Sequence, residues 1–357
     1  MVEMTSAGQV FQGTLAAVMP NRVFHLIYFV TARCNARCKM CFYLEQIKLA
    51  NKNLVNELTT NEVNKLASTI GHVPYLSLSG GEPFLRRDIY QIIDSLVSSA
   101  TPLLVSIPTN CAYPERVEDT ARRLSIAHPN TQFDIQLSLD GPEKLHDEIR
   151  QVPGLYRRLI ETHQRLIELQ KTAKNLGTKI VITYSTFNQT EVGDLLDHIS
   201  NELPVDRVIL AKAHGNCAPE TKDGMDMELF RRLLIRAEQI NSQNAHRRKL
   251  IGKLTLGIKS GKEKLRERFE RESNLGKYCG AGEKLVVLGE TGTVYPCEIL
   301  DRPLGNIRDH NYNLHQTLNS AMPDMKKQGV ITQCHCDWGC AQNIAVVTSP
   351  RFWRHIL

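Results

Sequence analysis

Short apolar runs alternate with amphipathic stretches over the first two thirds of the chain. Runs of strand length, rich in apolar, β-branched and aromatic residues, occupy residues 24–30, 75–78, 103–107, 133–139, 178–186 and 207–211. Between them, apolar residues recur at helical spacing over residues 60–70, 88–100, 114–127, 156–176 and 191–202. Strands that alternate with helices in this way predict parallel βα units with right-handed crossovers, too few of them for a complete eight-stranded barrel.

The last third of the chain has a different pattern. A helix is predicted over residues 225–241, and residues 244–274 are rich in Lys, Arg and Glu, which predicts bridging helices with a solvated charged face. Apolar residues 285–288 and 293–295 flank Gly-Glu-Thr-Gly, which is typical of a β-hairpin. Residues 9–18 predict a lead-in strand or hairpin. We divide the chain into a lead-in (1–23), the βα units (24–212), a loop with bridging helices (213–277) and a small α+β module (278–357).

Composition narrows the class of protein. The chain has 357 residues, of which 42% are hydrophobic and 23% charged, as in globular proteins with a sizeable core. Its net charge of +6 is mild and forms no dense basic stripe, so we do not expect nucleic-acid binding. No apolar run approaches the ~20 residues that span a membrane. Ten cysteines without a signal-peptide pattern indicate a reducing compartment, and we expect a cytoplasmic protein.

Three cysteines follow the first predicted strand. Cys34, Cys38 and Cys41 have the spacing C-x3-C-x2-C, with basic residues among them. Cationic neighbours lower the pKa of a thiol and favour a ligand loop over a packed core. Three thiolates can hold three irons of a cubane cluster and leave the fourth iron open to a small molecule. Zinc binding or simple packing is the alternative.

This loop resembles the signature of the radical S-adenosylmethionine (radical SAM) superfamily. The resemblance implies a partial (β/α)6 barrel, like part of a TIM barrel, over residues 24–212. It also implies a [4Fe-4S] cluster on Cys34, Cys38 and Cys41, whose open iron is chelated by S-adenosylmethionine. Reductive cleavage of that cofactor gives a 5'-deoxyadenosyl radical. The family usually has an aromatic residue before the third cysteine, near the adenine; this chain has Met40, whose thioether can also pack against a purine.

Further motifs resemble the family's cofactor pocket. Gly80, Gly81 and Glu82, at the end of the second strand, resemble the GGE motif that binds the amino group of S-adenosylmethionine. Asn110 belongs to a turn in which Cys111 replaces the family's glycine, so we expect the backbone there to differ.

The fourth predicted strand leads to two more motifs of this pocket. Ser138 and Asp140 resemble the S-x-D-G turn that meets the cofactor's ribose and carboxylate. Arg150 resembles the arginine that pairs with the methionine carboxylate, with a helix-surface ion pair as the alternative.

A second set of cysteines lies near the C-terminal end: Cys279, Cys297, Cys334, Cys336 and Cys340. The first two have the spacing Cys279-x12-Gly292-x4-Cys297. This arrangement resembles the SPASM/twitch extension of radical SAM proteins, whose first part reads C-x9-15-G-x4-C. The resemblance implies one auxiliary [4Fe-4S] cluster on Cys279, Cys297, Cys340 and either Cys334 or Cys336. Zinc is again the alternative.

Cys217 is the remaining thiol of interest. It lies close to His214 on the loop after the sixth strand, where it is a candidate hydrogen-atom donor or substrate contact.

The resemblance implies a radical SAM enzyme of an oxidoreductase or dehydrogenase-like type. We expect it to act on a small molecule of a natural-product or cofactor pathway, with an electron donor such as flavodoxin or ferredoxin. The segment before the first strand is too short for the leader-binding domain that many peptide modifiers carry, which favours a small molecule. The alternatives are a peptide-crosslinking or epimerising maturase, an RNA-modifying enzyme and a non-catalytic iron–sulfur electron carrier.

Overall fold

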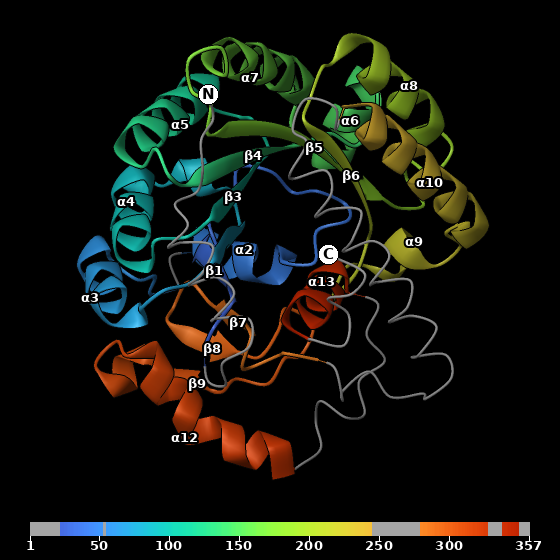
Figure 1. Ribbon diagram of the computed structural model, residues 1–357. Helices are drawn as coiled ribbons and strands as arrows, with labels where there is room; N and C mark the ends of the chain where they lie inside the picture. The colour runs from blue at the N-terminus through green and yellow to red at the C-terminus, as the bar shows by residue number, and fades with distance from the viewer. Residues whose placement is uncertain (1–21, 53–54, 245–278, 328–337, 350–357) are drawn as a thin grey trace.

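The computed structural model describes residues 22–52, 55–244, 279–327 and 338–349 (Figure 1). The lead-in element predicted at residues 9–18 and the bridging helices predicted after residue 244 lie outside these ranges. Cys334 and Cys336 lie outside them as well.

A curved parallel sheet forms the centre of the molecule, and the six strands predicted for the βα units are confirmed. Each strand pairs with the next one along the chain. In chain order they are β1 (His25–Thr31), β2 (Tyr75–Gly80), β3 (Leu104–Thr109), β4 (Gln132–Ser138), β5 (Leu176–Tyr184) and β6 (Arg207–Lys212). The predicted partial (β/α)6 barrel is therefore the fold of this part of the chain.

Helices cover the outer face of the sheet (Figure 1). They pack there because each carries an apolar stripe at helical spacing. In the helix over residues 60–70, for example, Val63, Leu66 and Ile70 are buried. The covering helices are α3 (Thr60–Ile70), α4 (Ile89–Ala100), α5 (Pro114–Ala127), α7 (Leu155–Leu169), α8 (Val192–Glu202) and α10 (Met227–Asn244).

The predicted helix over residues 156–176 is wrong at its C-terminal end. The helix α7 ends at Leu169, and β5 begins at Leu176. Asn175 explains the loop between them, because its side-chain amide donates to the carbonyl oxygens of Ser125, His128 and Thr131. These contacts fix Asn175 against the end of the preceding βα unit, just before β5 begins.

Several short elements were not predicted, since each has few buried residues from which a period can be recognised. They are α2 (Leu44–Asn51), η1 (Pro83–Leu85), α6 (Glu143–Arg150) and α9 (Pro219–Lys222). In α6, for example, only His146 and Ile149 are buried.

The predicted hairpin is confirmed as β7 (Leu285–Leu288) and β8 (Thr293–Tyr295). It does not stand apart from the barrel, because β7 pairs in parallel with β1, from His25↔Leu285 to Tyr28↔Leu288. With β9 (Gly305–Asn306) the sheet has nine strands in the order β6-β5-β4-β3-β2-β1-β7-β8-β9. The other C-terminal elements are η3 (Ile307–His310), α12 (Leu314–Lys327) and α13 (Gly339–Thr348).

The strand β1 divides two apolar cores. Its residues Leu26, Tyr28 and Val30 belong to the large core beneath the outer helices. Ile27 and Phe29 point to the other face, where they pack in a second core with apolar residues of β7 and α13. The C-terminal helix α13 therefore packs against the inner face of the sheet, beside the strand that leads into the cysteine loop.

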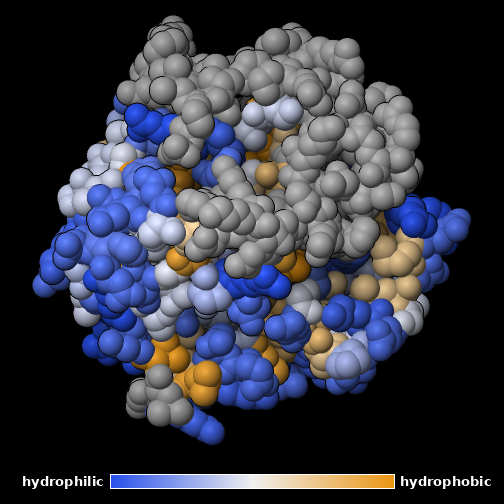
Figure 2. Space-filling view, turned by 90° about the horizontal axis from the view of Figure 1, so that it is seen from below, coloured by the Kyte–Doolittle hydropathy of each residue, from blue (hydrophilic) through white to orange (hydrophobic). Residues whose placement is uncertain are grey.

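On the face drawn in Figure 2, the described residues are mostly hydrophilic. Figure 2 shows apolar residues in small separate areas among hydrophilic ones on the face in view. Within the described ranges, no helix has both the length and the apolar character needed to cross a membrane.

Candidate active site

The cysteine loop leaves the C-terminal end of β1 and lies against the end of α6. The backbone N–H of Arg37 donates to the Arg150 carbonyl at 3.3 Å, and that of Lys39 donates to Ile149 at 3.0 Å. The Arg37 guanidinium donates to the Cys34 carbonyl oxygen at 2.9 Å and so fixes the loop from within. The last carbonyls of a helix have no partner inside it, so this loop satisfies them.

The thiols of this loop are largely withdrawn from solvent. Burial raises the pKa of Cys34 to about 12 and that of Cys41 to about 11, and it also raises the pKa of Cys38. The prediction that the interleaved cations would lower these pKa values is therefore wrong. Arg37 binds carbonyl oxygens, and Lys39 pairs with Glu148 on the surface.

The donor set fits an iron–sulfur cluster. Cys34 Sγ accepts a hydrogen bond from the Ala36 N–H at 3.4 Å and lies 3.9 Å from the Asn110 amide nitrogen. Such N–H donors stabilise the charge of a ligating thiolate. Iron binding displaces the proton that burial otherwise retains. In the described ranges, no three His, Cys, Asp or Glu side chains converge on a single metal ion.

The Gly-Gly turn after β2 packs directly onto the base of the cysteine loop. The Gly81 N–H donates to the Thr31 carbonyl at 2.7 Å, and the Glu82 N–H donates to the Arg33 carbonyl at 2.9 Å. Gly80 has φ +104°, in the region that favours glycine. A Cβ on Gly81 would lie 2.1 Å from the Arg33 carbonyl oxygen. Only residues without a side chain allow this approach.

Glu82 is buried and held by three donors. Its carboxylate accepts from the Asn110 N–H at 2.7 Å, the Thr109 hydroxyl at 2.9 Å and the Phe84 N–H at 3.2 Å. Burial nevertheless raises the pKa of Glu82 to about 7, against the effect of these hydrogen bonds. The Asn110 side chain reaches on to Asn35 at 2.9 Å, so it links the carboxylate to the cysteine loop. Sequence reasoning missed Asn35, because it occupies an unspecified position of the cysteine motif.

The turn after β3 keeps a glycine-like backbone. Cys111 has φ 66°, in the left-handed region, and its side chain is fully buried. The prediction that the cysteine would change the backbone there is not supported, because Cys111 adopts a conformation that glycine adopts readily.

Asp140 and Arg150 form a buried ion pair. The Arg150 Nε lies 2.6 Å and its Nη2 2.5 Å from Asp140 Oδ2, and the two side chains are only 11% and 0% exposed. The alternative of a surface ion pair is therefore wrong: the pair is buried, and Arg150 lies close enough to Cys38 to oppose the rise in the pKa of that thiol.

The other oxygen of Asp140 is also occupied. It accepts from the Thr183 N–H at 2.8 Å, and the Asn188 amide donates to the Asp140 carbonyl at 2.9 Å. His146 Nδ1 accepts from the Asp140 N–H at 3.2 Å. Sequence reasoning missed both residues: the Asp140 carbonyl lies 48 residues before Asn188, and the Asp140 N–H that His146 accepts is a backbone group that no side-chain motif marks.

Met40 lies in a small apolar cluster on the other side of the loop. It packs with Ile149, Ala213 and Cys217, and the half-buried Phe187 packs against the same cluster. Cys217 is therefore close to the cysteine loop, as expected for the catalytic face. Its neighbour in the sequence, His214, lies elsewhere: its ring is 3.9 Å from that of Trp338 and 5.0 Å from that of Phe42, measured between centroids.

The inner face of the sheet stays partly exposed next to this site. Along β2, β4, β5 and β6, the residues that point away from the outer helices keep intermediate exposure while their neighbours are buried. Toward the C-terminal ends of these strands, the partly exposed residues include Ser77, Ser79, Gln136, Ser138, Val181, Thr183, Ile209 and Ala211. This face is polar near the cysteine loop, in contrast to the apolar layers that fill a complete barrel.

Three cysteines of the C-terminal part lie in or beside the second core. Cys297 belongs to it and Cys279 packs against it, while Cys340 precedes its member Ala341 in α13. The Gly282 N–H donates to the Pro296 carbonyl at 3.1 Å, which brings the segments of the first two together. Cys297 Sγ accepts from the Ile299 N–H at 3.3 Å, the same arrangement as at Cys34.

The chain is similar in sequence to the Radical SAM family model and to proteins named as heme-pathway enzymes. Residues 28–199 match the model of the Radical SAM superfamily. The AdoMet-dependent heme synthase of Oleidesulfovibrio alaskensis is 24% identical over 296 residues, which are 79% of this chain and 71% of that protein. The pre-heme d1 synthase of Dinoroseobacter shibae is 26% identical over 169 residues, 46% of this chain, so the match spans only 37% of that relative. AdoMet is S-adenosylmethionine.

A solved structure supports the fold over almost the whole chain. Native anSMEcpe with bound AdoMet and Cp18Cys peptide has a TM-score of 0.57 and 15% identity, covering 93% of this chain and 95% of its own.

Proposed function

The chain belongs to the radical SAM superfamily, and on this premise we propose that the cysteine loop holds a [4Fe-4S] cluster on Cys34, Cys38 and Cys41 that binds S-adenosylmethionine. When bound, the cluster and the cofactor supply a 5'-deoxyadenosyl radical that takes a hydrogen atom from substrate. One observation carries the proposal: the Gly80-Gly81-Glu82 turn hydrogen-bonds to the base of this loop, and the buried Asp140–Arg150 pair flanks it beside Cys38.

The residues around the loop have separate tasks in this proposal. Glu82 presents a carboxylate for the amino group of S-adenosylmethionine, and Thr109 and Asn110 hold that carboxylate in place. Arg150 places a positive charge near the cofactor carboxylate and the Cys38 thiolate, while Asp140 fixes its orientation. Met40 provides apolar surface for the adenine. For Ser138, on the partly exposed inner face, we propose contact with the ribose.

We propose a small polar molecule of a cofactor or natural-product pathway as the substrate. Two relatives carry names of heme biosynthesis, and the polar inner face beside the loop offers hydroxyl and amide groups from Ser77, Ser79 and Gln136. Peptide modification is the second candidate, because the structure of similar fold contains a bound peptide.

We also propose an auxiliary [4Fe-4S] cluster on Cys279, Cys297, Cys340 and one of Cys334 and Cys336. The N–H donor at Cys297 and the closeness of its segment to that of Cys279 support the site. Net oxidation of the substrate radical, as in a dehydrogenase, would use this second cluster as the electron acceptor. We place the protein in the cytoplasm, with flavodoxin or ferredoxin as electron donor.

Anaerobic incubation with dithionite and S-adenosylmethionine tests the proposal. We expect 5'-deoxyadenosine from the native enzyme and none from Cys34→Ala. The control Ser98→Ala removes a small polar side chain that is exposed on α4, away from the proposed ligands, and we expect it to retain cleavage. The Cys297→Ala variant should retain cleavage while losing about four irons per chain. Equal 5'-deoxyadenosine from Cys34→Ala and the native enzyme would refute the proposed function.

A further inference from the structure

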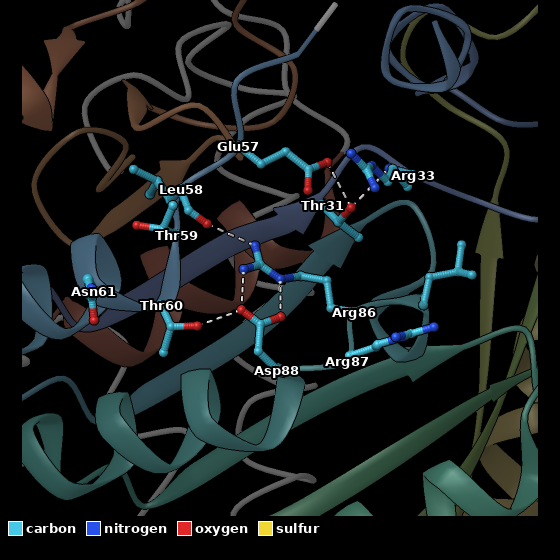
Figure 3. A pocket seen from close by; sticks show the side chains of 11 residues that line it. Thr31, Arg33, Glu57, Leu58, Thr59, Thr60, Asn61, Arg86, Arg87 and Asp88 are labelled. Atoms are coloured by element: carbon cyan, nitrogen blue, oxygen red, sulfur yellow. Dashed lines mark hydrogen bonds and ion pairs between the residues drawn. The ribbon is translucent and has the colours of Figure 1, made fainter. Parts of the chain in front are cut away.

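A pocket of about 730 Å³ opens at the rim of the barrel, outside the sheet and next to the start of the cysteine loop (Figure 3). It lies between the N-terminal end of α3 and the segment that follows the Gly-Gly-Glu turn. Its lining residues are Thr31, Arg33, Glu57, Leu58, Thr59, Thr60, Asn61, Leu85, Arg86, Arg87 and Asp88.

Arg86 and Asp88 form an ion pair in the centre of the pocket, and both side chains also hydrogen-bond to other groups of the protein. Arg86 donates to both oxygens of Asp88, at 2.9 and 2.7 Å, and its Nη1 donates to the Leu58 carbonyl (Figure 3). The same Nη1 also donates to the Val30 carbonyl at 2.8 Å. The Thr60 hydroxyl donates to Asp88 at 2.6 Å. The charges of this pair cancel locally, so the pair shapes the pocket without attracting a charged ligand.

The remaining carboxylate also has internal partners. Glu57 accepts from the Thr31 hydroxyl at 2.8 Å and from the Ala32 N–H at 2.9 Å. It therefore ties the end of β1 to the segment before α3. These donors are neutral, so Glu57 keeps its negative charge, and any positive charge of the rim must exceed it.

Two further guanidinium groups line the pocket and, unlike that of Arg86, are exposed to solvent. Arg33 and Arg87 are both exposed, and neither has an ion pair or a side-chain hydrogen bond to any residue of the described ranges. The N-terminal end of α3 adds little to this charge, because Glu62 lies in its first turn and forms a capping box with Thr59. The rim thus presents positive charge that is not used within the described structure.

The two exposed guanidinium groups lie next to the proposed cluster loop. Arg33 directly precedes Cys34, and its carbonyl oxygen receives the Glu82 N–H, so the pocket lies against the base of the proposed cluster loop. Reductive cleavage requires one electron to reach this loop from outside the protein. A donor protein must therefore dock close to the loop, and opposite charge accelerates such an encounter.

We propose that the rim around Arg33 and Arg87 is the docking surface for an acidic electron-transfer protein that reduces the cluster. This inference rests on the proposed function. The acidic partner would place its carboxylates against the two guanidinium groups. An exposed basic pair elsewhere, Arg231 and Arg232 on α10, belongs to the far edge of the sheet beside β6 and provides a matched comparison.

The test measures the rate at which a photoreduced bacterial flavodoxin reduces the purified enzyme, followed by stopped-flow absorbance at low and high salt. For Arg33→Glu combined with Arg87→Glu we expect a rate constant at least about tenfold lower at low salt, with most of the salt dependence lost. Arg231→Glu combined with Arg232→Glu should behave as the native enzyme. The single variant Arg87→Gln, which leaves the residue next to Cys34 unchanged, should show a smaller loss in the same direction.

Dithionite separates the inference from the proposed function. With this small reductant, Arg87→Gln and the Arg231/Arg232 variant should form 5'-deoxyadenosine at the native rate, and the flavodoxin rate of the Arg33/Arg87 variant is read relative to its own rate with dithionite. No loss with flavodoxin in the Arg33/Arg87 variants, or an equal loss in the Arg231/Arg232 variant, would overturn the docking surface. A loss of equal size with dithionite would show that the arginines act in folding or cofactor binding, which also overturns it. Absence of 5'-deoxyadenosine from the native enzyme would instead refute the proposed function.

Discussion

Replacing Gly81 by alanine should disturb the cofactor site without adding charge or removing a ligand. Gly81 lies in the turn after β2, and its N–H donates to the Thr31 carbonyl at 2.7 Å. An alanine Cβ there would lie 2.1 Å from the Arg33 carbonyl oxygen and 2.6 Å from its carbon. Both atoms are backbone, so no side chain can rotate to relieve the contact.

The size of the effect follows from this distance. Cβ contacts in real structures essentially never fall below 3.0 Å, whereas this one would be 2.1 Å. The turn and the base of the cysteine loop must therefore separate by roughly 1 Å, and a misplacement of about 1 Å can cost about 10²-fold in rate. We expect a loss of this order in 5'-deoxyadenosine formation, together with weaker binding of S-adenosylmethionine.

Gly193→Ala is the matched control. Gly193 lies within α8, where a Cβ would meet only Leu233 at an ordinary 3.8 Å, so this variant should be as active and at least as stable as the native protein. Iron content and absorbance, measured for both variants, separate a misplaced cluster from a lost one. Native rate and native cofactor affinity in Gly81→Ala would refute the packing argument.

The other predictions concern three buried contacts around the loop. Asp140→Asn should lower the free energy of unfolding by about 3–5 kcal/mol, because Arg150 is left buried without its counter-charge; an unchanged melting temperature would contradict this. Because burial raises the pKa of Glu82 to about 7, its carboxylate gains a proton as the pH falls through that value. The affinity for S-adenosylmethionine, measured by calorimetry, should therefore fall between about pH 8 and 6 in the native protein and stay weak and flat in Glu82→Gln. The pKa of Glu82 lies above 4.5, so the folded state should also lose stability as the pH rises from 4.5 to about 7. Tyr43→Phe removes the hydroxyl that donates to the buried Glu290 carboxylate, and we expect a lower melting temperature and an altered electron paramagnetic resonance spectrum of the reduced cluster; a native spectrum would count against a positioning role.

The barrel could be predicted from the sequence because its strands and helices carry strong and different periods. Apolar runs of strand length, such as that of β1, and helices with a clear apolar stripe, such as α3, recur in regular alternation. The hairpin could be predicted for a similar reason, since Gly289 and Gly292 mark its turn between two apolar runs. Local pattern is sufficient where an element buries one continuous face.

Contacts between distant segments could not be predicted in the same way. The three carbonyls bound by Asn175 lie 44 to 50 residues away, and no local pattern announces them. Arg150 was expected at the cofactor, but the sequence did not show that Asp140, ten residues earlier, would take up its guanidinium in the buried site. The rise in the pKa of the three thiols could not be predicted either, because a sequence shows which residues are charged but not how far each thiol is buried.

The pairing of β7 with β1 gives the C-terminal part a structural role that does not depend on its cysteines. The hairpin turn contacts two segments that follow the cysteine loop: the Tyr43 hydroxyl donates to the Glu290 carboxylate, and the Leu58 N–H, just before α3, donates to the Glu290 carbonyl at 2.7 Å. On the same side, Arg308 binds Glu62 at the start of α3. A change in the hairpin therefore moves groups in both segments. These contacts hold the hairpin turn against the segments that follow the cysteine loop, whether or not electrons pass between the two proposed clusters.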